Sequence, residues 1–328
     1  MRTCVTGGAG FIGSHLVDAL LARGDSVTVL DDLSTGSIGN IAGHLGNERF
    51  EFVQGSILDA PTVSQAIRGC ETVFHLAAAV GVRLIVERPM HSFRTNVEGT
   101  EVVLAETLRT GARVLVTSTS EIYGKSAAVP LREDDDRLLG SALVARWSYS
   151  MAKAVDELLA YQYWVEDALE AVIVRLFNTT GPRQSPGYGM VLPRFVRQAL
   201  ADEPLTVHGD GTQRRCFGYV GDIVPAMMAL TECDDAVGQA INLGSTEETS
   251  IAELASLVIE LTGSVSPVRF VPYDEAFPPG FEDLPRRVPS IEKAQRLIGF
   301  APSASLREIV QLTIADARQE AMSAGRAG

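Results

Sequence analysis

A tyrosine and a lysine four residues apart have types and a spacing that could do chemistry. Tyr149 precedes Lys153 in Tyr-Ser-Met-Ala-Lys, and the next residues favour a helix, which places both side chains on one face. A nearby cation lowers the pKa of a tyrosine from about 10 toward neutral pH, so that its phenolate can accept the proton of an alcohol while hydride leaves the same carbon. With seven tyrosines and three lysines in the chain, roughly 6% of comparable sequences would show this spacing by chance, for example on an amphipathic surface helix.

A glycine-rich turn lies near the start of the chain. Residues 7–13 read Gly-Gly-Ala-Gly-Phe-Ile-Gly, directly after a β-branched run and at the start of a helical pattern. Glycines at such a turn let the backbone approach a pyrophosphate, whose charge is met by the helix N-terminus. A tight turn that needs glycine only for its geometry is the alternative. The predicted cofactor contacts in this turn are Gly7, Gly10, Phe11, Ile12 and Gly13.

Two aspartates end the next β-branched run. A carboxylate at Asp31 is placed to accept hydrogen bonds from an adenosine ribose and would repel a 2'-phosphate. Asp32 adds a second negative charge, and no arginine occurs after it until Arg49, so the sequence favours NAD over NADP. The alternative for either aspartate is to cap the turn. Asp31 is the predicted ribose ligand.

The elements that must position these residues are predicted from an alternation of short β-branched runs with helical stretches. Ile12, Leu16 and Leu20 predict a helix that stops at Gly24. The predicted fold is α/β, a doubly wound parallel sheet of the Rossmann type with a second, smaller α/β substrate domain. The first domain is predicted over residues 1–176 with a return at about 208–244, and the second over 177–328, with a ligand cleft between them. The expected strands are 3–6, 27–30, 50–53, 72–76, 114–117 and 172–176.

Composition narrows the classes of partner. The formal net charge of −13 disfavours binding to nucleic acid or to anionic membranes, because like charges repel. No apolar run is long enough for a membrane span, and the N-terminus enters a strand pattern at once, so we expect a cytoplasmic protein. The four cysteines show neither a metal-ligand spacing nor the density of a small secreted scaffold, and we expect free thiols and no metal.

Taken together, the glycine turn, Tyr149-x-x-x-Lys153, His75-Leu76-Ala77-Ala78 and Asn96 make the chain resemble the extended short-chain dehydrogenase/reductase family of nucleotide-sugar epimerases, dehydratases and decarboxylases. The resemblance spans nearly the whole chain. It implies NAD as cofactor, although Ser56 stands where many members have an aspartate that contacts adenine. The further cofactor contacts that it implies are Asp32, Ser56, Ile57, Leu76, Ala77, Ala78, Asn96, Tyr149 and Lys153.

The same resemblance implies that the second domain holds the nucleotide diphosphate of a UDP-sugar. Arginine forks suit phosphates, although each arginine alone could be a surface ion-pair partner in an acidic protein. Arg83 is a candidate contact for a substrate carboxylate, with a solvated surface position as its alternative. The predicted substrate contacts are Arg83, Asn178, Val191, Leu192, Thr206, Arg215 and Arg287.

Residues 118–124, Ser-Thr-Ser-Glu-Ile-Tyr-Gly, bear on the type of reaction. Within the family, Thr119, Ser120 and Glu121 resemble the UDP-glucuronate decarboxylases, and Arg215 falls where those enzymes have a catalytic arginine. Oxidation at C4 would make the C6 carboxylate a β-keto acid; carbon dioxide can leave, and a proton must then reach C5. The expected product is a UDP-4-keto-pentose or, if hydride returns, UDP-xylose.

Three alternatives stay open at this point. A UDP-hexose 4-epimerase and a nucleotide-sugar 4,6-dehydratase share the Tyr149 and Lys153 oxidation and differ in the fate of the ketone. A regulatory dinucleotide-binding protein of the same fold has no need for that pair. The family further implies a homodimer that pairs helices at about residues 91–110 and 148–166.

Overall fold

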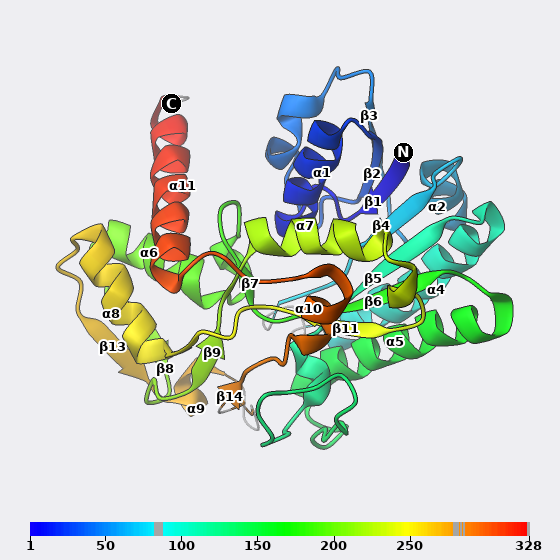
Figure 1. Ribbon diagram of the computed structural model, residues 1–328. Helices are drawn as coiled ribbons and strands as arrows, with labels where there is room; N and C mark the ends of the chain where they lie inside the picture. Colours follow the sequence, from blue (N-terminus) through cyan, green and yellow to red (C-terminus); the bar gives the residue numbers. More distant parts are fainter. Residues whose placement is uncertain (82–87, 278–281, 283, 285, 327–328) are drawn as a thin grey trace.

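Seven parallel strands form the central sheet of the protein, in the order β11-β6-β5-β4-β1-β2-β3 (Figure 1). The structure is a computed structural model that describes residues 1–81, 88–277, 282, 284 and 286–326. The predicted fold class is confirmed, and each expected strand is present within a residue or two of its predicted ends. The strands are β1 Arg2–Thr6, β2 Ser26–Asp31, β3 Phe50–Gln54, β4 Thr72–His75, β5 Arg113–Thr119, β6 Ala171–Leu176 and β11 Ala240–Leu243.

The strand order reverses between β1 and β4. From β1 the chain proceeds to β2 and β3 on one side, and then crosses back to β4 on the other side, where β1 pairs with both β2 and β4. At such a reversal the loops after the two central strands separate, so that a crevice opens at their carboxyl ends. The glycine turn after β1 and the segment after β4 therefore border the same crevice.

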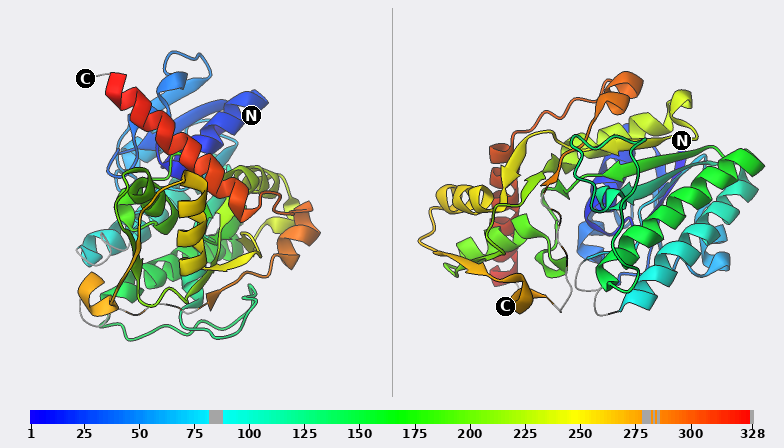
Figure 2. Two further views of the ribbon diagram at one scale, coloured as in Figure 1. Left: turned by 90° about the vertical axis from the view of Figure 1, so that its left-hand side faces the viewer. Right: turned by 90° about the horizontal axis from the view of Figure 1, so that it is seen from below.

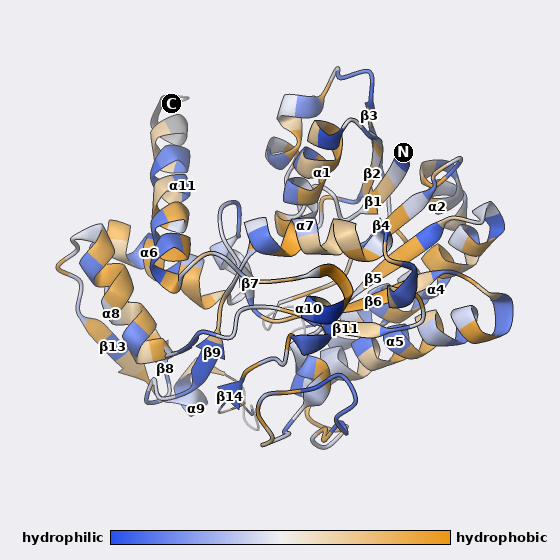
Figure 3. Cartoon of the chain, viewed as in Figure 1, coloured by the Kyte–Doolittle hydropathy of each residue, from blue (hydrophilic) through white to orange (hydrophobic). Residues whose placement is uncertain are grey.

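Helices cover both faces of the sheet because alternate strand residues are apolar on each face. Leu115 of β5 packs in the cluster under α1 and α7, whereas Val114 and Val116 pack under the opposite helices. Figure 3 shows the hydrophobic strands between the two helical layers. One layer consists of α1 Phe11–Arg23, α7 Val220–Thr231 and α10 Glu292–Ile298, and the other of α2 Ala60–Ala66, α4 Pro89–Thr110 and α5 Ser148–Asp167.

The first helix ends where its pattern predicts. Gly24 comes after the last helical residue with a φ of 101°, and its amide donates to the carbonyls of Leu20 and Leu21. Only glycine adopts this left-handed conformation without a steric cost, so it stops the helix and turns the chain into β2.

A second region carries its own core. Its helices are α6 Val191–Leu200, α8 Ile251–Thr262, α9 Tyr273–Ala276 and α11 Leu306–Arg326, and Figure 2 shows this region beside the central sheet and its helices. Three small sheets accompany them, in the orders β12-β9-β14, β13-β8 and β10-β7. Their strands are β7 Thr179–Thr180, β8 Leu205–His208, β9 Arg214–Cys216, β10 Gly218–Tyr219, β12 Glu248–Ser250, β13 Val268–Val271 and β14 Arg286–Arg287.

The chain passes between the two regions more than once. Residues 220–243 leave the second region, pack α7 against α1, and add β11 beside β6. The boundary after residue 176 and the return at about 208–244 stay predictions. None of the helices that the structure describes is long and apolar enough to cross a membrane.

Candidate active site

A cavity of about 1240 Å³ lies at the carboxyl ends of the central strands and extends into the second region. Its walls come from the glycine turn, from the ends of β2, β4 and β5, from the start of α5 and from β9 and β14. Tyr149, Lys153, Arg215 and Arg287 line it together, although they are far apart in the sequence. The fold thus brings most of the predicted cofactor, catalytic and substrate residues to one cavity.

The glycine turn fits a dinucleotide phosphate. Gly7 has a φ of 73°, and a Cβ at Gly13 would lie 2.1 Å from the Gly7 carbonyl oxygen, so no larger residue fits there. Gly10 is the N-cap of α1 and has no side chain that could occupy the first amides of the helix. Those amides open toward the cavity and can meet an anion. All five residues predicted in this turn line the cavity.

Asp31, the last residue of β2, and the next residue Asp32 both line the cavity and also bind backbone amides. Asp31 accepts from Ala9 at 3.0 Å and from Leu33 at 2.8 Å, and Asp32 accepts from Ser34 at 2.9 Å. Burial raises the pKa of Asp31, and the two backbone hydrogen bonds oppose that rise. Asp31 therefore ties the end of β2 to the glycine turn and keeps spare lone pairs for a ribose hydroxyl.

The other predicted cofactor residues divide into two groups. Ser56, Ile57, Leu76, Ala77 and Ala78 line the cavity. Asn96, a described residue of α4, does not line it: its side chain accepts from the Ala79 amide at 2.7 Å and donates to the Ala79 carbonyl at 3.3 Å. Asn96 therefore fixes the loop after β4 from the side away from the cavity. Any effect of Asn96 on a bound ligand acts through residues 77–79.

Tyr149 and Lys153 lie on the first turns of α5. Both line the cavity, and the Lys153 ammonium donates to the Thr117 carbonyl of β5 at 2.9 Å. The same ammonium lies 3.0 Å from a carboxylate oxygen of Asp156. Burial, Glu121 and Asp156 raise the pKa of Tyr149 above its ordinary value, and Arg146 opposes them. Burial is the largest of these influences, and the favourable effect of the Lys153 charge on the Tyr149 phenolate stays a prediction.

Glu121 is a carboxylate fixed between arginines. Arg146 binds it through both of its terminal nitrogens, one of them at 2.9 Å, and Arg287 reaches it at 3.3 Å. Burial alone would raise the pKa of Glu121. The positive charges of Arg146, Arg287 and Arg215 outweigh this effect and lower the pKa to about 2. Glu121 is therefore ionised at neutral pH and acts as a charged anchor in the wall of the cavity.

Thr119 and Ser120 directly precede Glu121 in the chain. The Thr119 hydroxyl accepts from the Glu121 amide at 3.3 Å and caps the short helix η3 Ser120–Tyr123. The Ser120 hydroxyl accepts from Arg287 at 3.5 Å. Thr119, Ser120 and Glu121 all line the cavity, next to Tyr149.

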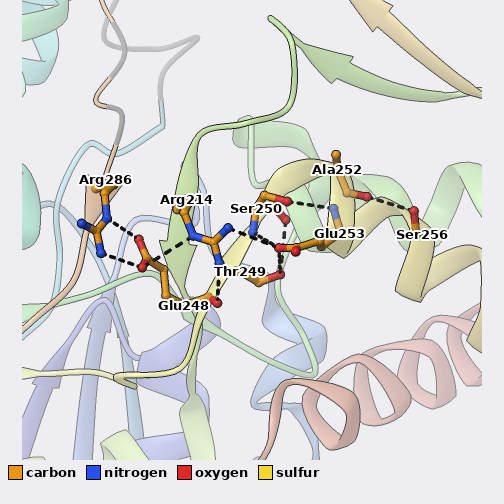
Figure 4. Close-up of polar contacts among 8 residues, drawn as sticks. All are labelled: Arg214, Glu248, Thr249, Ser250, Ala252, Glu253, Ser256 and Arg286. Atoms are coloured by element: carbon orange, nitrogen blue, oxygen red, sulfur yellow. Dashed lines mark hydrogen bonds and ion pairs between the residues drawn. The ribbon is translucent and has the colours of Figure 1, made fainter.

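Two arginines reach the cavity from neighbouring strands. β14 pairs with β9 so that Arg287 lies beside Arg215 and Arg286 beside Arg214. Because strand side chains alternate between faces, Arg215 and Arg287 are buried toward the cavity while Arg214 and Arg286 lie on the other face. There both bind Glu248 of β12, Arg286 through two contacts of 2.8 Å (Figure 4).

The remaining predicted substrate residues are only partly at the cavity. Asn178, Val191 and Leu192 line it, and the side-chain amide of Asn178 donates to the Cys216 carbonyl at 3.0 Å. The described residue Thr206 does not line it, because its hydroxyl and its amide are bonded to Gln198 on α6. Arg83 lies outside the described residues.

Several residues that line the cavity are not predicted from the sequence. Arg146 is the most informative of them, since it is 4% exposed and pairs with Glu121 from the turn before Tyr149. Its position just before the tyrosine is a signal that could have found it. At the far end, His208 packs edge-on against Phe277 at 5.0 Å and Tyr273 stacks on the same ring. They come from β8 and α9, and no local motif joins them.

Comparisons with known proteins agree with this geometry. The profile of the NAD dependent epimerase/dehydratase family matches residues 3–244. The chain is 40% identical to a UDP-N-acetyl-alpha-D-glucosaminuronate decarboxylase of Bacillus cytotoxicus, over 95% of this chain and 96% of that protein. It is 39% identical to UDP-glucuronic acid decarboxylase 2 of Arabidopsis thaliana, over 97% and 68%.

Among solved structures, the chain superposes on a UDP-glucuronic acid 4-epimerase from Bacillus cereus in complex with UDP-glucuronic acid and NAD. The TM-score is 0.88 with 30% sequence identity, over 98% of this chain and 100% of that one. The match covers both the central sheet and the second region. The chain therefore belongs to the NAD dependent epimerase/dehydratase family.

Proposed function

We infer that this protein is an NAD-dependent UDP-glucuronate decarboxylase, which oxidises C4 of the sugar and releases carbon dioxide from the 4-keto intermediate. The observation that carries the proposal is Glu121, an ionised carboxylate held by Arg146 and Arg287 beside Tyr149. A simple epimerase needs only the oxidising pair. An arginine-lined wall next to that pair suits a substrate that carries its own carboxylate. Relatives named as decarboxylases, 39–40% identical over nearly the whole chain, support the same interpretation.

NAD is the cofactor of the proposed reaction. The open amides of α1, the glycine turn and Asp31 would hold it, and when bound it supplies the acceptor for the C4 hydride. Tyr149 would take the proton of the C4 hydroxyl. Lys153 donates to the Thr117 carbonyl, and Thr119 and Ser120, which line the same cavity, would border the sugar.

The second step removes the sugar carboxylate. With C4 as a ketone, the C5–C6 bond breaks, carbon dioxide leaves, and the electron pair becomes an enolate that accepts a proton at C5. We propose that Arg215 and Arg287 contact the carboxylate or deliver this proton, and that Glu121 orients Arg287. Glu121 itself has a pKa of about 2 and carries no proton to give at neutral pH. The predicted product is a UDP-4-keto-pentose, or UDP-xylose where hydride returns.

A related substrate is the second candidate. The 40% identical relative from Bacillus cytotoxicus is named as a decarboxylase of UDP-N-acetyl-alpha-D-glucosaminuronate, a sugar with the same C6 carboxylate. The same two steps would apply to it. Two other reactions must be distinguished from decarboxylation, namely 4-epimerisation of UDP-glucuronate and 4,6-dehydration of a nucleotide sugar.

Product masses test these alternatives directly. The protein is incubated with NAD and, separately, with UDP-glucuronate, UDP-N-acetylglucosaminuronate, UDP-glucose and dTDP-glucose. Loss of about 44 mass units from a uronate identifies decarboxylation with return of the hydride, loss of about 46 identifies decarboxylation to the 4-keto-pentose, and loss of about 18 identifies dehydration. An altered sugar of unchanged mass would mean epimerisation and would overturn the proposal. Tyr149→Phe is the control that should give no product.

We further propose a homodimer and a cytoplasmic location. The exposed side of α5 carries Leu158, Tyr161 and Val165, which are 55%, 43% and 55% exposed, an apolar surface that suits a helical interface. All four cysteines, which lie within the described residues, are free, as suits a reducing compartment. Light scattering that gives the mass of a single chain at micromolar concentration would contradict the dimer.

A further inference from the structure

The proposed mechanism leaves one buried acid of the site unused. Asp156 lies on α5 less than one turn after Lys153, with no exposed surface. Its carboxylate is 3.0 Å from the Lys153 ammonium, which is itself 2% exposed. Burying a carboxylate is costly unless an opposite charge pairs with it, so the placement of Asp156 is tied to the lysine.

The groups around this pair are neutral or engaged elsewhere. On β5, the Thr117 carbonyl accepts from Lys153 at 2.9 Å. On α4, the Thr100 hydroxyl lies 3.0 Å from His75 on β4. Burial and the nearby lysine lower the pKa of His75 to about 3, so it is uncharged at neutral pH. Neither Thr100 nor His75 therefore adds charge to the pair.

The next acid on α5 does not compete for the lysine. Glu157 binds Arg175 of β6 through both carboxylate oxygens, at 2.8 and 2.9 Å, and accepts from the Ser118 hydroxyl. Among the described residues around Lys153, Asp156 is thus the acid that contacts it. Burial raises the pKa of Asp156, and Lys153 opposes that rise.

The ion pair of Lys153 and Asp156 bears on the charge environment of Tyr149. Burial raises the pKa of Tyr149, the negative charges of Glu121 on η3 and of Asp156 raise it further, and Arg146 on η4 Ala145–Trp147 lowers it. Arg287 and Arg215 act on Glu121 from β14 and β9. The lysine charge, which would otherwise favour the phenolate, is offset at 3.0 Å by Asp156.

We propose that Asp156 is a positioning residue that holds Lys153 against β5 and offsets its charge, so that Tyr149 works beside a neutral ion pair. The formation of the phenolate then depends on positive charge that arrives with the cofactor. This inference deepens the proposed function, because it takes Tyr149 as the base. It makes Asp156 a determinant of the pH at which the oxidation runs.

The test measures the ionisation of Tyr149 without turnover. Tyrosines of the NAD-loaded protein are labelled with ¹³C at Cζ, and the Tyr149 resonance is assigned by its loss in Tyr149→Phe. The titration is recorded for the unaltered protein, for Asp156→Asn and for Asp156→Ser. Asp167→Asn is the matched control, because it removes the same charge from the exposed end of the same helix. Two substitutions at position 156 guard against one of them failing to fold.

Both position-156 variants should move the Tyr149 midpoint about one pH unit lower, and Asp167→Asn should leave it unchanged. A midpoint that stays in place or rises in the position-156 variants overturns the proposal. The acid limb of UDP-glucuronate oxidation should shift together with the resonance. If no UDP-sugar is oxidised at all, the proposed function fails, whereas a lowered midpoint would still support the role of Asp156 at Tyr149.

Discussion

At the scale of single residues, the cavity wall is governed by how buried charges are paired. Glu121 keeps its charge because Arg146 and Arg287 contact it, and its pKa lies at about 2 instead of 4.5. Arg146 is buried and depends on Glu121 in turn. Removing one partner of such a pair leaves the other charge buried and uncompensated. The free-energy cost of removing one partner is therefore larger than the net stability that the intact pair contributes.

Replacing Glu121 with Gln should destabilise the protein by about 3 kcal/mol at neutral pH, because the buried Arg146 loses the negative charge of the carboxylate that contacts it. A carboxyl group with a depressed folded-state pKa stabilises above its unfolded pKa and loses that effect as pH falls through its folded pKa. The difference in unfolding free energy between the two proteins should therefore shrink between pH 4.5 and about 2. Urea unfolding at a series of pH values measures it. A difference that is constant over this range would contradict the assigned charge state.

At the scale of elements, a three-stranded sheet aims two arginines at the cavity. The register of β9 with β14 places Arg215 beside Arg287, and Glu248 on the opposite face joins the two strands through Arg214 and Arg286 (Figure 4). Since this outer network is partly exposed, it contributes modestly to stability. The network of Glu248 with Arg214 and Arg286 should instead affect how Arg215 and Arg287 are positioned at the cavity.

Glu248→Gln should raise KM for UDP-glucuronate roughly two- to fivefold, in line with the at most about 1 kcal/mol expected of a partly exposed ion-pair network. NAD affinity should not change, because the glycine turn is on the central sheet. Steady-state kinetics and NAD titration measure the two effects. Glu260→Gln is the matched control, since Glu260 pairs with Arg307 on the surface and should leave KM as it is. An equal rise in the control would refute a positioning role for Glu248.

The same sheet leads into α8 through a capping box. Ser250 accepts from the Glu253 amide at 3.1 Å, and the Glu253 carboxylate accepts from the Ser250 amide at 2.7 Å. Ser250→Ala should lower the free energy of unfolding by about 1 kcal/mol. Ser256→Ala, on the exposed side of the same helix, loses only a bond to the Ala252 carbonyl and should change it far less. Equal effects in urea unfolding would contradict the cap.

At the scale of the whole molecule, the central sheet and its helices could be predicted because their signals are local. The strands are β-branched runs, Gly24 stops α1, and the glycine turn comes directly after β1. The pairing of Arg287 with Glu121 could not be predicted, because it joins segments 166 residues apart. Which face of α5 is buried also depends on α4 and β5, so the contact of Asp156 with Lys153 became visible only in the fold.

The central claim is that the sugar is decarboxylated after oxidation at C4. UDP-glucuronate labelled with ¹³C at C6 tests it most directly, by tracing the label in the presence of the protein and NAD. We predict that ¹³C leaves as carbon dioxide in step with the formation of an unlabelled UDP-pentose or UDP-4-keto-pentose, and that Tyr149→Phe releases none. Label that stays in a UDP-hexuronate, with the sugar epimerised or unchanged, would contradict the claim.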